Sequence, residues 1–342
     1  MIECILNEIV SQVSYLENQI IETIYFGGGT PSILTFKEIG TIIQTIKGNY
    51  SVIPTAEITL EANPDDINLE SLSAWKKSGI NRLSIGLQSF REEDLEWMNR
   101  AHSKEEALNC VSLAKRAGFD NISVDLIYGL PKFTIEDWKK NIVTVINFGI
   151  QHVSAYCLTV EQKTVLSKWV EQNKIIPANE DDQSDQFEVL LHELEKEGIE
   201  QYEISNFARP GFHSKHNSNY WKGKHYLGIG PSAHSFDGIS RRWNISNNRE
   251  YMKNILEDKT WFETEILSIE NQFNELLLIG LRTALGVNLE QLKTIQIPSQ
   301  EFWTQIKKME NLGWMELKND AIILTKKGKL KADYIASELF IG

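Results

Sequence analysis

The chain has 342 residues, a length that suits about two domains. With 42% apolar and 24% charged residues it has the composition of a globular protein, which excludes a disordered, collagen-like or coiled-coil chain. Its 47 acidic and 35 basic side chains give a net charge of −12, so it lacks the basic footprint of a protein whose main partner is a nucleic acid.

Strands and helices alternate over the first 160 residues. Short β-branched runs predict strands, and apolar residues at steps of three and four predict amphipathic helices. The predicted strands cover 21–26, 57–60, 82–87, 121–128 and 152–158. The predicted helices cover 1–20, 35–47, 69–77, 103–117 and 135–148. This order specifies parallel βαβ units and therefore an α/β fold, either a barrel or a doubly wound open sheet.

The residues with special chemistry favour one of these two folds. Glycine-rich or polar segments follow the strands at 27–31, 61–64, 88–89 and 129–131, and Asp125 lies near the end of its strand. Parallel barrels place their chemistry at the carboxyl ends of their strands. Because the pattern recurs at successive strand ends, it favours a barrel or partial barrel with a site at its mouth.

The alternation breaks after residue 160. We expect a helix over 181–197, a strand over 202–207 and an irregular segment over 208–247 that covers the mouth. Three helices around a two-strand pattern at 314–324 predict a small winged-helix-like α+β domain, whose charges nearly cancel and give no sign of DNA binding. The predicted division is a barrel core at 1–165, a barrel extension at 166–265 and the small domain at 266–342.

Three consecutive glycines, Gly27, Gly28 and Gly29, stand between a predicted strand and a predicted helix. Without side chains, the backbone there can approach a ligand closely. A tight turn is the structural alternative, but it needs fewer glycines. The segment lacks the lysine of a nucleotide-binding phosphate loop and the spacing of the dinucleotide fingerprint. We therefore interpret the glycines as part of a binding site.

Four polar residues, Glu61, Gln88, Arg100 and Asp125, lie in or just after three successive strands. A carboxylate in the apolar run around Asp125 is costly to bury unless a hydroxyl, an amine or a guanidinium partners it. A structural ion pair, for example with Arg82 or Arg100, is the alternative for each residue taken alone. As a set beside a glycine-rich strand end, the four residues favour a site for a polar small molecule.

Four of the seven histidines fall between residues 213 and 234, among aromatic side chains. Such a cluster can hold a metal, a haem or a flat conjugated ligand. The alternative is a loop packed by its own aromatic rings, and we prefer that structural role for His213 and His225. For the segment from His216 to Trp221 both roles remain open.

Eight short motifs occur in an order that makes the chain recognisable. They are GGGTP at 27–31, EANP at 61–64, GLQS at 86–89, RAH at 100–102, DLIYGLP at 125–131, YEISNFA at 202–208, HNSNYW at 216–221 and GIGPSAHSF at 228–236. Together they resemble the radical S-adenosylmethionine proteins related to oxygen-independent coproporphyrinogen III oxidase. The later motifs are similar to those of the HemW branch, a family of haem chaperones. The resemblance covers nearly the whole chain.

The resemblance implies a partial (β/α)6 barrel, without the family's first strand in this chain, that holds S-adenosylmethionine at its mouth. By the matching motifs, the residues that bind S-adenosylmethionine are Gly28, Gly29, Thr30, Glu61, Gln88, Arg100 and Asp125. The HNxxYW motif of the haem-handling branch is matched by His216, Asn217, Tyr220 and Trp221. The chemistry agrees, since glycine carbonyls suit an ammonium, arginine a carboxylate, and carboxylate or amide groups the ribose hydroxyls. No catalytic residue and no protein metal ligand is assigned.

The family's iron–sulfur motif has no counterpart in this sequence. In the family a CxxxCxxC loop supplies the thiolates of a [4Fe–4S] cluster, whereas this chain has three cysteines far apart, Cys4, Cys110 and Cys157. We therefore expect no cluster and no radical chemistry from this chain. The odd cysteine count indicates a reducing cytosol, and no apolar run reaches the roughly 18 residues of a membrane span.

Two functions follow from the resemblance. The first is a haem-binding chaperone that delivers haem to an acceptor protein, and HNxxYW favours it. The second is an oxygen-independent coproporphyrinogen III oxidase of porphyrin biosynthesis, which uses a 5′-deoxyadenosyl radical. A plain S-adenosylmethionine-binding remnant is expected if neither haem nor porphyrin binds. The expected location is cytoplasmic, and the oligomeric state, including a homodimer, remains open.

Overall fold

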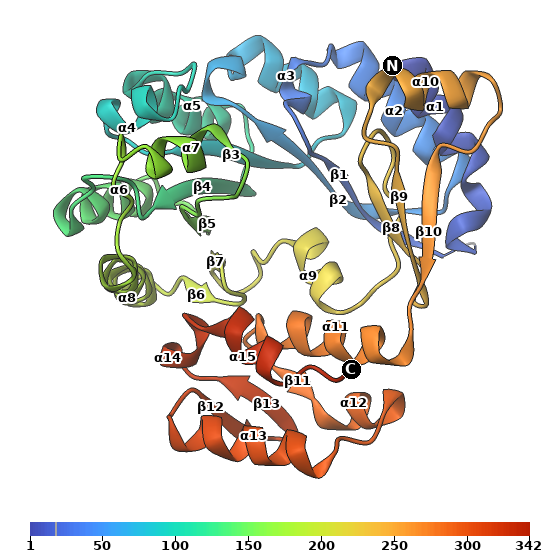
Figure 1. Ribbon diagram of the computed structural model, residues 1–342. Coiled ribbons are helices and arrows are strands. Elements are labelled where there is room, and N and C mark those ends of the chain that lie inside the picture. The colour runs from blue at the N-terminus through green and yellow to red at the C-terminus, as the bar shows by residue number, and fades with distance from the viewer. Residues whose placement is uncertain (18) are drawn as a thin grey trace. The chain divides into compact units, whose positions relative to one another are not determined.

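The computed structural model describes residues 1–17 and 19–342. Over these residues, seven strands form one sheet in the order β1-β2-β3-β4-β5-β7-β6 (Figure 1). They are β1 (Ile21–Phe26), β2 (Val52–Ala62), β3 (Arg82–Gln88), β4 (Ile122–Tyr128), β5 (His152–Cys157), β6 (Glu200–Gln201) and β7 (Asn206–Ala208). The run from β2 to β5 is parallel, and β7 pairs antiparallel with β5 and β6. The parallel strands keep their chain order, as in a barrel, whereas a doubly wound sheet reverses it, so the predicted barrel-type fold is confirmed.

Helices connect the parallel strands, and local sequence signals define their ends. They are α2 (Phe36–Asn49), α3 (Leu69–Ser78), α4 (Glu92–Trp97), α5 (Lys104–Arg116) and α6 (Ile135–Asn147). Asn68, Ser103 and Thr134 each begin a helix with a capping box. Gly79, at a φ of 103°, ends α3 in the left-handed region that favours glycine. The predicted βαβ elements are observed with small shifts, except that β2 begins at Val52 rather than at residue 57.

Two compact units share the chain. The sheet unit consists of residues 24–36 and 57–213, and the composite unit consists of residues 1–23, 37–56 and 214–342. Each unit is assembled from separate segments of the chain, and the composite unit includes both chain ends. The three-part division of the sequence stays a prediction.

One face of the sheet unit is polar along the length of its strands. Side chains alternate between the two faces of a strand. On β3, Leu83, Ile85 and Leu87 are fully buried, as expected for the face that the helices cover (Figure 1). The alternate residues are polar or small: Glu57, Thr59 and Glu61 on β2, Arg82, Ser84 and Gly86 on β3, Ser123 and Asp125 on β4, and His152 and Ser154 on β5. Parallel sheets are normally apolar on both faces, so this inner face suits a polar ligand or water.

After β5 the sheet unit continues with α7 (Val165–Glu171) and α8 (Glu180–Lys196). The helix predicted at 181–197 is α8. The strand predicted at 202–207 is instead the pair β6 and β7 with a tight turn between them. The turn forms because the Tyr202 N–H bonds to the Asn206 carbonyl at 3.1 Å, and the Gln201 side chain bonds to the Ile204 carbonyl at 2.9 Å. A segment of strand-like composition therefore reverses direction.

The segment at 208–247, expected to be irregular, contains regular structure. It holds α9 (Lys215–Trp221), β8 (His234–Phe236) and β9 (Ser240–Asn244), and β9 pairs antiparallel with β8 and with β10 (Phe262–Ile266). The sequence hides α9 because Asn, Ser and His have low helix propensity and the helix is short. Ser214 caps this helix by accepting the Asn217 N–H at 3.2 Å.

The chain starts with α1 (Ile2–Ser11) and the 3-10 turn η1 (Val13–Leu16), so the helix predicted over 1–20 is shorter than expected. Glu8 on α1 is buried. Its carboxylate accepts hydrogen bonds from the Gly230 N–H at 2.8 Å, Asn244 Nδ2 at 2.6 Å, Trp261 Nε1 at 3.0 Å and the Tyr251 hydroxyl of α10 (Asn248–Leu256). These donors offset the cost of burying the charge, and Glu8 ties α1 to segments more than 220 residues away.

The last part of the composite unit has the predicted winged-helix-like form. Its elements are α11 (Ile269–Leu281), β11 (Val287–Asn288), α12 (Leu289–Ile295), α13 (Gln300–Asn311), β12 (Met315–Lys318), β13 (Ala321–Leu324), α14 (Lys326–Lys329) and α15 (Ala332–Glu338). The strands form an antiparallel sheet in the order β11-β13-β12. Phe273 and Phe302 pack edge to face in its core, with ring centres 5.9 Å apart. The sequence pattern missed β11 and α12, which are too short for periodicity to show.

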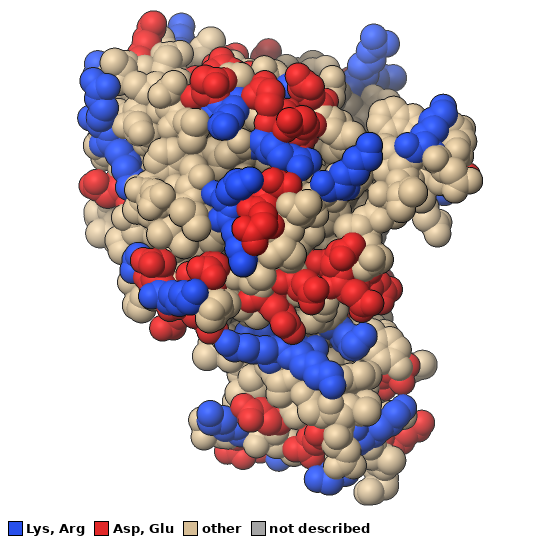
Figure 2. Space-filling view, turned by 90° about the vertical axis from the view of Figure 1, so that its left-hand side faces the viewer, with Lys and Arg blue, Asp and Glu red and all other residues tan. Residues whose placement is uncertain are grey.

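Within the residues that the structure describes, no helix is both long enough and apolar enough to cross a membrane. Figure 2 shows acidic and basic side chains interspersed over the face that it draws. Such mixing is ordinary for the surface of a globular protein.

Candidate functional site

The glycine segment forms an open strand end in the sheet unit. Gly28 and Gly29 have φ values of 87° and 57°, in the left-handed region, and a Cβ on either would meet no atom within 4 Å. Gly27 differs, because a Cβ there would lie 2.5 Å from the Tyr25 ring. Thr30 follows and leads into a 3-10 turn. The segment therefore packs on Tyr25 and leaves a stretch of backbone open to a ligand.

Glu61 stands at the end of β2 with its carboxylate held on both sides. The Tyr25 hydroxyl donates to Oε1 at 2.7 Å, and the Gly28 N–H donates to Oε2 at 3.2 Å. The charge of Glu61 also acts on Asp125 across the strands. The glycine segment and the carboxylates predicted from the sequence thus meet at one end of the sheet.

Gly86 is surrounded by polar side chains. A Cβ at this position would lie 3.0 Å from Gln88 Nε2 and 3.4 Å from Arg100 Nη2, so glycine leaves room for both. Arg100 Nη2 donates to Asn63 Oδ1 at 2.9 Å and to the Gly86 carbonyl at 3.3 Å. Asn63 belongs to the EANP motif but is not among the predicted site residues. The contact between Asn63 and Arg100 is evident only from the structure, which places the end of β2 beside the segment that carries Arg100.

Gln88 has an unusual backbone conformation. Its φ is 66°, in the left-handed region, and the register between β3 and β4 shifts between Ile85 and Gln88. A residue other than glycine is strained in this region, and such strain recurs at ligand-binding sites. The strained turn presents the Gln88 amide beside Gly86.

Asp125 lies on the inner face of β4 and is bonded to hydroxyl groups. Ser84 Oγ donates to Oδ1 at 3.4 Å, and Ser154 forms a second hydrogen bond. Although the side chain keeps some exposure, the surrounding protein desolvates the carboxylate and raises its pKa to about 6. The hydroxyl partner expected for this carboxylate is present, whereas Arg82 pairs with Glu57, with Nε and Oε2 4.0 Å apart.

A chain of hydrogen bonds continues from Asp125 along the inner face. Ser154 Oγ lies 3.4 Å from Ser123 Oγ, which lies 2.8 Å from His152 Nδ1. His152 Nε2 is 2.7 Å from the Tyr202 hydroxyl. Burial holds the pKa of His152 well below its usual value, so the imidazole is neutral. None of the residues in this network except Asp125 was predicted from the sequence, although the alternation of polar and apolar residues in β4 and β5 is a signal for it.

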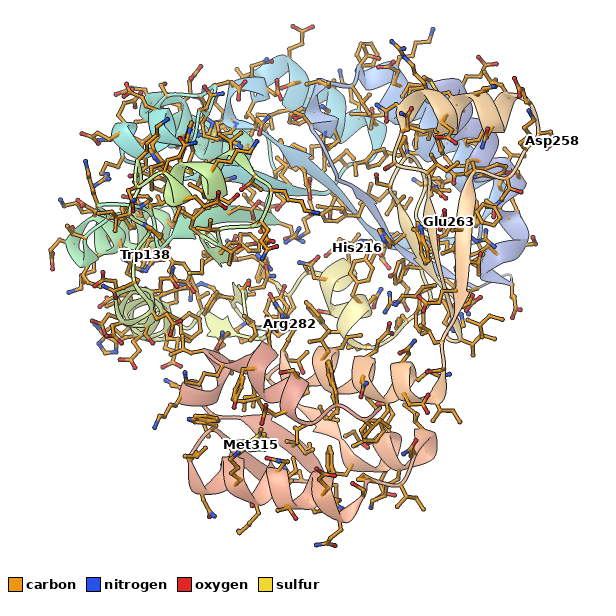
Figure 3. The ribbon with its side chains drawn as sticks, in the orientation of Figure 1. Trp138, His216, Asp258, Glu263, Arg282 and Met315 are labelled. Atoms are coloured by element: carbon orange, nitrogen blue, oxygen red, sulfur yellow. The ribbon has the colours of Figure 1, made fainter. Side chains whose placement is uncertain are left out.

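His216 lies on α9 in the composite unit (Figure 3). Its Nδ1 is 3.0 Å from Thr23 Oγ1, and its Nε2 is 3.1 Å from the Tyr220 hydroxyl. The His216 and Tyr220 rings meet edge to face with centres 4.9 Å apart. Hydrogen bonds at both nitrogens therefore fix the orientation of this imidazole.

The other residues of the HNxxYW motif lie on the same helix. Tyr220 is 38% exposed and packs edge to face against Tyr226, with ring centres 4.6 Å apart. Trp221 Nε1 is buried and has no hydrogen-bond partner among the residues that are described. The Asn217 N–H is taken by the helix cap. The motif thus presents an oriented imidazole, an aromatic surface and an indole donor on one short helix.

His213 and His225 make contacts that fit the structural roles expected of them. His213 stacks on Tyr202, with ring centres 4.4 Å apart and an angle of 16°. His225 Nδ1 is 2.7 Å from the Gln19 side chain.

The three cysteines lie on different elements. Cys4 is buried on α1, where its thiol donates to the Met252 carbonyl at 3.8 Å. Burial raises the pKa of Cys110 to about 12 and that of Cys157 to about 11, which disfavours the thiolate forms that bind iron. Over residues 1–17 and 19–342, no group of three or more histidine, cysteine, aspartate or glutamate side chains could hold a metal ion. The expectation about the cluster stays a prediction.

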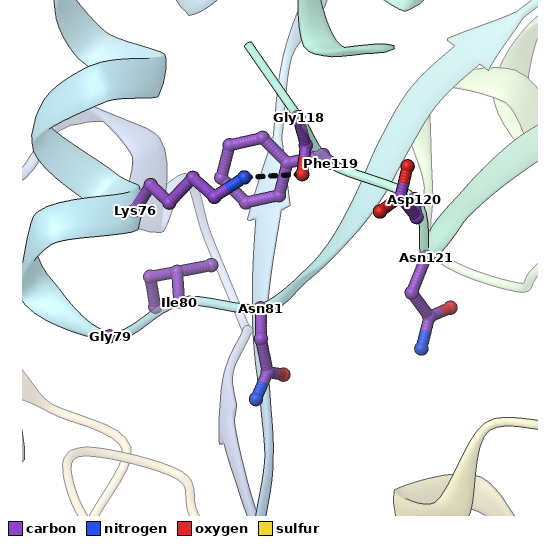
Figure 4. Close-up of a pocket in the computed structure, with 8 residues that line it drawn as sticks. All are labelled: Lys76, Gly79, Ile80, Asn81, Gly118, Phe119, Asp120 and Asn121. Carbon is purple, nitrogen blue, oxygen red and sulfur yellow. Dashed lines mark hydrogen bonds between the residues drawn. The ribbon is translucent and has the colours of Figure 1, made fainter.

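A hollow of about 410 Å³ opens at the amino-terminal ends of β3 and β4 (Figure 4). Its lining residues are Lys76, Gly79, Ile80, Asn81, Gly118, Phe119, Asp120 and Asn121, and none of them is a predicted site residue. Lys76 donates to the carbonyl oxygens of Gly118 and Ala117 and lies 5.5 Å from the centre of the Phe119 ring. Because these carbonyls end α5, Lys76 serves as a cap of that helix. The predicted site residues Glu61, Gln88 and Asp125 lie toward the opposite, carboxyl ends of the strands.

The family of the chain follows from comparison with known proteins. Residues 5–155 match the Radical SAM superfamily, and residues 267–330 match the HemN C-terminal domain. The chain is 32% identical over 329 residues to "Heme chaperone HemW" of Bacillus subtilis, covering 94% of this chain and 86% of that protein. It is also 32% identical to "Heme chaperone HemW" of Lactococcus lactis, covering 96% and 86%.

A solved structure shows the same fold. Coproporphyrinogen III oxidase (HemN) from Escherichia coli superimposes with a TM-score of 0.83, covering 99% of this chain and 82% of that one, at 22% identity. The resemblance read from the motifs is confirmed by these matches. The chain belongs to the HemW family of the radical S-adenosylmethionine superfamily.

Proposed function

We propose that this chain binds haem on α9 and delivers it to an acceptor protein. Relatives that align with nearly the whole chain carry the name heme chaperone. The observation that carries the proposal is the oriented imidazole of His216, whose two nitrogens lie 3.0 Å and 3.1 Å from hydroxyl oxygens. Histidine is a common axial ligand of haem iron, and the neighbouring rings of Tyr220 and Tyr226 suit its flat apolar face.

The charges around α9 support the same ligand. Lys215, Lys222 and Lys224 act together on Glu22, which keeps its pKa low chiefly through a hydrogen bond from Lys224. Haem carries propionate carboxylates, which form strong charge-assisted hydrogen bonds with basic side chains. The indole N–H of Trp221 adds a donor without a partner among the described residues.

We also propose that the sheet unit holds S-adenosylmethionine. The residues assigned to it are Gly28, Gly29, Thr30, Glu61, Gln88, Arg100 and Asp125. The fit is supported by the open backbone at the glycines and by groups of both charge signs at one end of the sheet. Arg100 suits a carboxylate, glycine carbonyls suit an ammonium, and Gln88 or Asp125 suits ribose hydroxyls.

An oxidase that acts on coproporphyrinogen III is the second candidate. Its support is the likeness to HemN, which at 22% identity extends to the fold alone. Burial keeps the thiols of Cys110 and Cys157 protonated, which does not favour the cluster that radical chemistry requires. The haem chaperone is therefore the preferred function.

A haem titration followed at the Soret band tests the assignment of α9. His216→Ala is expected to weaken binding about tenfold or more, because the iron loses an axial nitrogen. His225→Ala is the matched control, since His225 is also held by a hydrogen bond, of 2.7 Å to Gln19. Trp221→Phe is expected to weaken binding less, because it keeps an aromatic ring. Equal affinities across the set would remove haem from α9 and overturn the proposal.

Delivery is a separate property and needs its own measurement. The haem-loaded chain is mixed with an apo-haemoprotein, and the shift of the Soret band to that of the acceptor is timed. The same acceptor with free haem is the control. Transfer that depends on the concentration of the acceptor supports direct delivery, whereas a rate limited by release into solution contradicts it.

A further inference from the structure

Two hydroxyl groups bracket the imidazole of His216. Thr23 Oγ1 lies 3.0 Å from Nδ1, and the Tyr220 hydroxyl lies 3.1 Å from Nε2. Thr23 ends the first segment of the composite unit and is 193 residues from His216 in sequence. Tyr220 is one helical turn further along α9. Each ring nitrogen therefore has a partner from a different part of the unit.

The two hydroxyls differ in the role that suits them. A phenol is more acidic than an aliphatic alcohol and is the better donor, whereas the alcohol oxygen is the better acceptor. A tyrosine phenol keeps its proton at neutral pH and is therefore available as a donor. The favoured arrangement has Tyr220 donating to Nε2 and Nδ1–H donating to Thr23. In this tautomer Nε2 carries the lone pair.

We propose that Thr23 is a positioning residue that fixes the tautomer of His216, and that the Tyr220 hydroxyl occupies Nε2 until haem iron replaces it. The proposal rests on the proposed function, because it concerns the residue assigned to haem. Histidines that bind metals generally donate their second ring N–H to an oxygen acceptor, which orients the ring and makes the bound nitrogen more basic. When iron binds, the hydrogen bond between Tyr220 and Nε2 breaks, the bond between iron and Nε2 forms, and the phenol keeps its proton.

Opposite effects follow for the two hydroxyls. Removing the hydroxyl of Tyr220 removes the hydrogen bond that competes with iron at Nε2, so haem binds more tightly. Removing the hydroxyl of Thr23 releases the ring and allows the other tautomer, so haem binds less tightly. The ring of Tyr220 and its packing against Tyr226 are retained in the phenylalanine variant. General damage to α9 would weaken binding in both variants and cannot give opposite signs.

The experiment compares Thr23→Val, Thr23→Ser and Tyr220→Phe with the wild type and His216→Ala. One net hydrogen bond corresponds to about three- to tenfold in affinity. Tyr220→Phe is expected to bind haem tighter by about this factor and Thr23→Val weaker, while Thr23→Ser keeps a hydroxyl and matches the wild type. Nitrogen NMR of the haem-free protein is expected to show the Nδ1–H tautomer of His216 in the wild type and a mixture in Thr23→Val. The iron–histidine stretching frequency of the ferrous complex should fall in Thr23→Val.

The outcomes distinguish a failure of the roles assigned to Thr23 and Tyr220 from a failure of haem binding at α9. An unchanged tautomer and an unchanged iron–histidine frequency in Thr23→Val would overturn the role of Thr23. Unchanged or weaker haem binding by Tyr220→Phe would overturn the role of Tyr220. If His216→Ala binds haem like the wild type, the proposed function itself fails at α9, and this inference fails with it.

Discussion

The Tyr25 hydroxyl donates a hydrogen bond of 2.7 Å to Glu61 Oε1, from the end of β1 to the end of β2. The same carboxylate accepts the Gly28 N–H at 3.2 Å through its other oxygen. Desolvation raises the pKa of Tyr25, and the hydroxyl therefore stays protonated and keeps donating. One phenol thus sets the direction of the Glu61 carboxylate and supports the glycine segment with its ring.

Tyr25→Phe is expected to weaken S-adenosylmethionine binding about three- to tenfold, because Glu61 loses one hydrogen bond while the ring remains. Isothermal titration calorimetry measures the change. Tyr50→Phe is the control, since the Tyr50 hydroxyl donates to the Ile9 carbonyl at 2.8 Å within the composite unit. An affinity of Tyr25→Phe equal to that of the wild type would show that Tyr25 does not prepare Glu61 for the ligand.

The left-handed backbone of Gln88 predicts a conflict between stability and binding. Gln88→Gly relieves the strain and is expected to be more stable than Gln88→Ala by about 1 kcal/mol, because alanine is disfavoured at a φ of 66°. Both variants lose the side-chain amide and should bind S-adenosylmethionine more weakly. Urea unfolding gives the two free energies of unfolding. Equal stability of the glycine and alanine variants would contradict the assignment of strain.

The raised pKa of Asp125, about 6, predicts that stability depends on pH. Between the ordinary value of 3.8 and about 6, the folded carboxyl is protonated while the unfolded one is ionised, so the folded state binds more protons. The contribution of this group to the free energy of unfolding is therefore fully present below the ordinary value and is lost as pH rises through about 6. Asp125→Asn should abolish this part of the pH dependence in urea unfolding at a series of pH values. If Asp125→Asn keeps the wild-type dependence of the free energy of unfolding on pH, a group other than Asp125 is responsible for that dependence.

The same group predicts a pH dependence of ligand binding. If the Asp125 carboxylate accepts hydrogen bonds from S-adenosylmethionine, affinity rises as pH increases through about 6, where the carboxyl ionises. Calorimetric titrations on either side of this pH measure the effect. Asp125→Asn is expected to bind more weakly above this pH and to show a flat profile. A flat profile in the wild type would mean that the ionised carboxylate is not used.

Glu8 is predicted to matter for folding rather than for ligand contact. Glu8→Ala leaves buried donors such as Trp261 Nε1 and the Gly230 N–H without their acceptor, and the free energy of unfolding should fall by about 3 kcal/mol or more. Glu22→Gln is the matched control, because Glu22 pairs with Lys224 at an exposed site where an ion pair contributes about 0–1 kcal/mol. Similar losses in the two variants would show that the buried Glu8 carboxylate contributes no more to the free energy of unfolding than the exposed ion pair of Glu22 does.

Local sequence determined much of the fold. The caps at Asn68, Ser103 and Thr134 and the glycine at position 79 act on neighbours within a few residues, so their effect can be read directly from the chain. The order of strands and helices follows from periodicity, and the barrel-type fold follows from the parallel βαβ rule. The family was readable for a similar reason, since its motifs are short and occur in a fixed order.

The sequence carried weaker signals for other features. The alternating polar residues in β3 and β4 are a signal for a polar inner face. The apolar residues between them, however, gave both strands the pattern of ordinary core strands. The helix α9 was hidden by its low helix propensity, and its formation depends on the Ser214 cap and on packing rather than on periodicity.

The pairings that the proposals depend on came from the tertiary structure alone. Thr23 and His216 are 193 residues apart, and Glu8 and Trp261 are 253 residues apart, so no local pattern joins them. The sequence supplied the histidine, the hydroxyls and the carboxylate as chemical groups. Which atom faces which is decided by the path of the chain, because a hydrogen bond requires donor and acceptor within about 3 Å and folding alone brings such distant groups together.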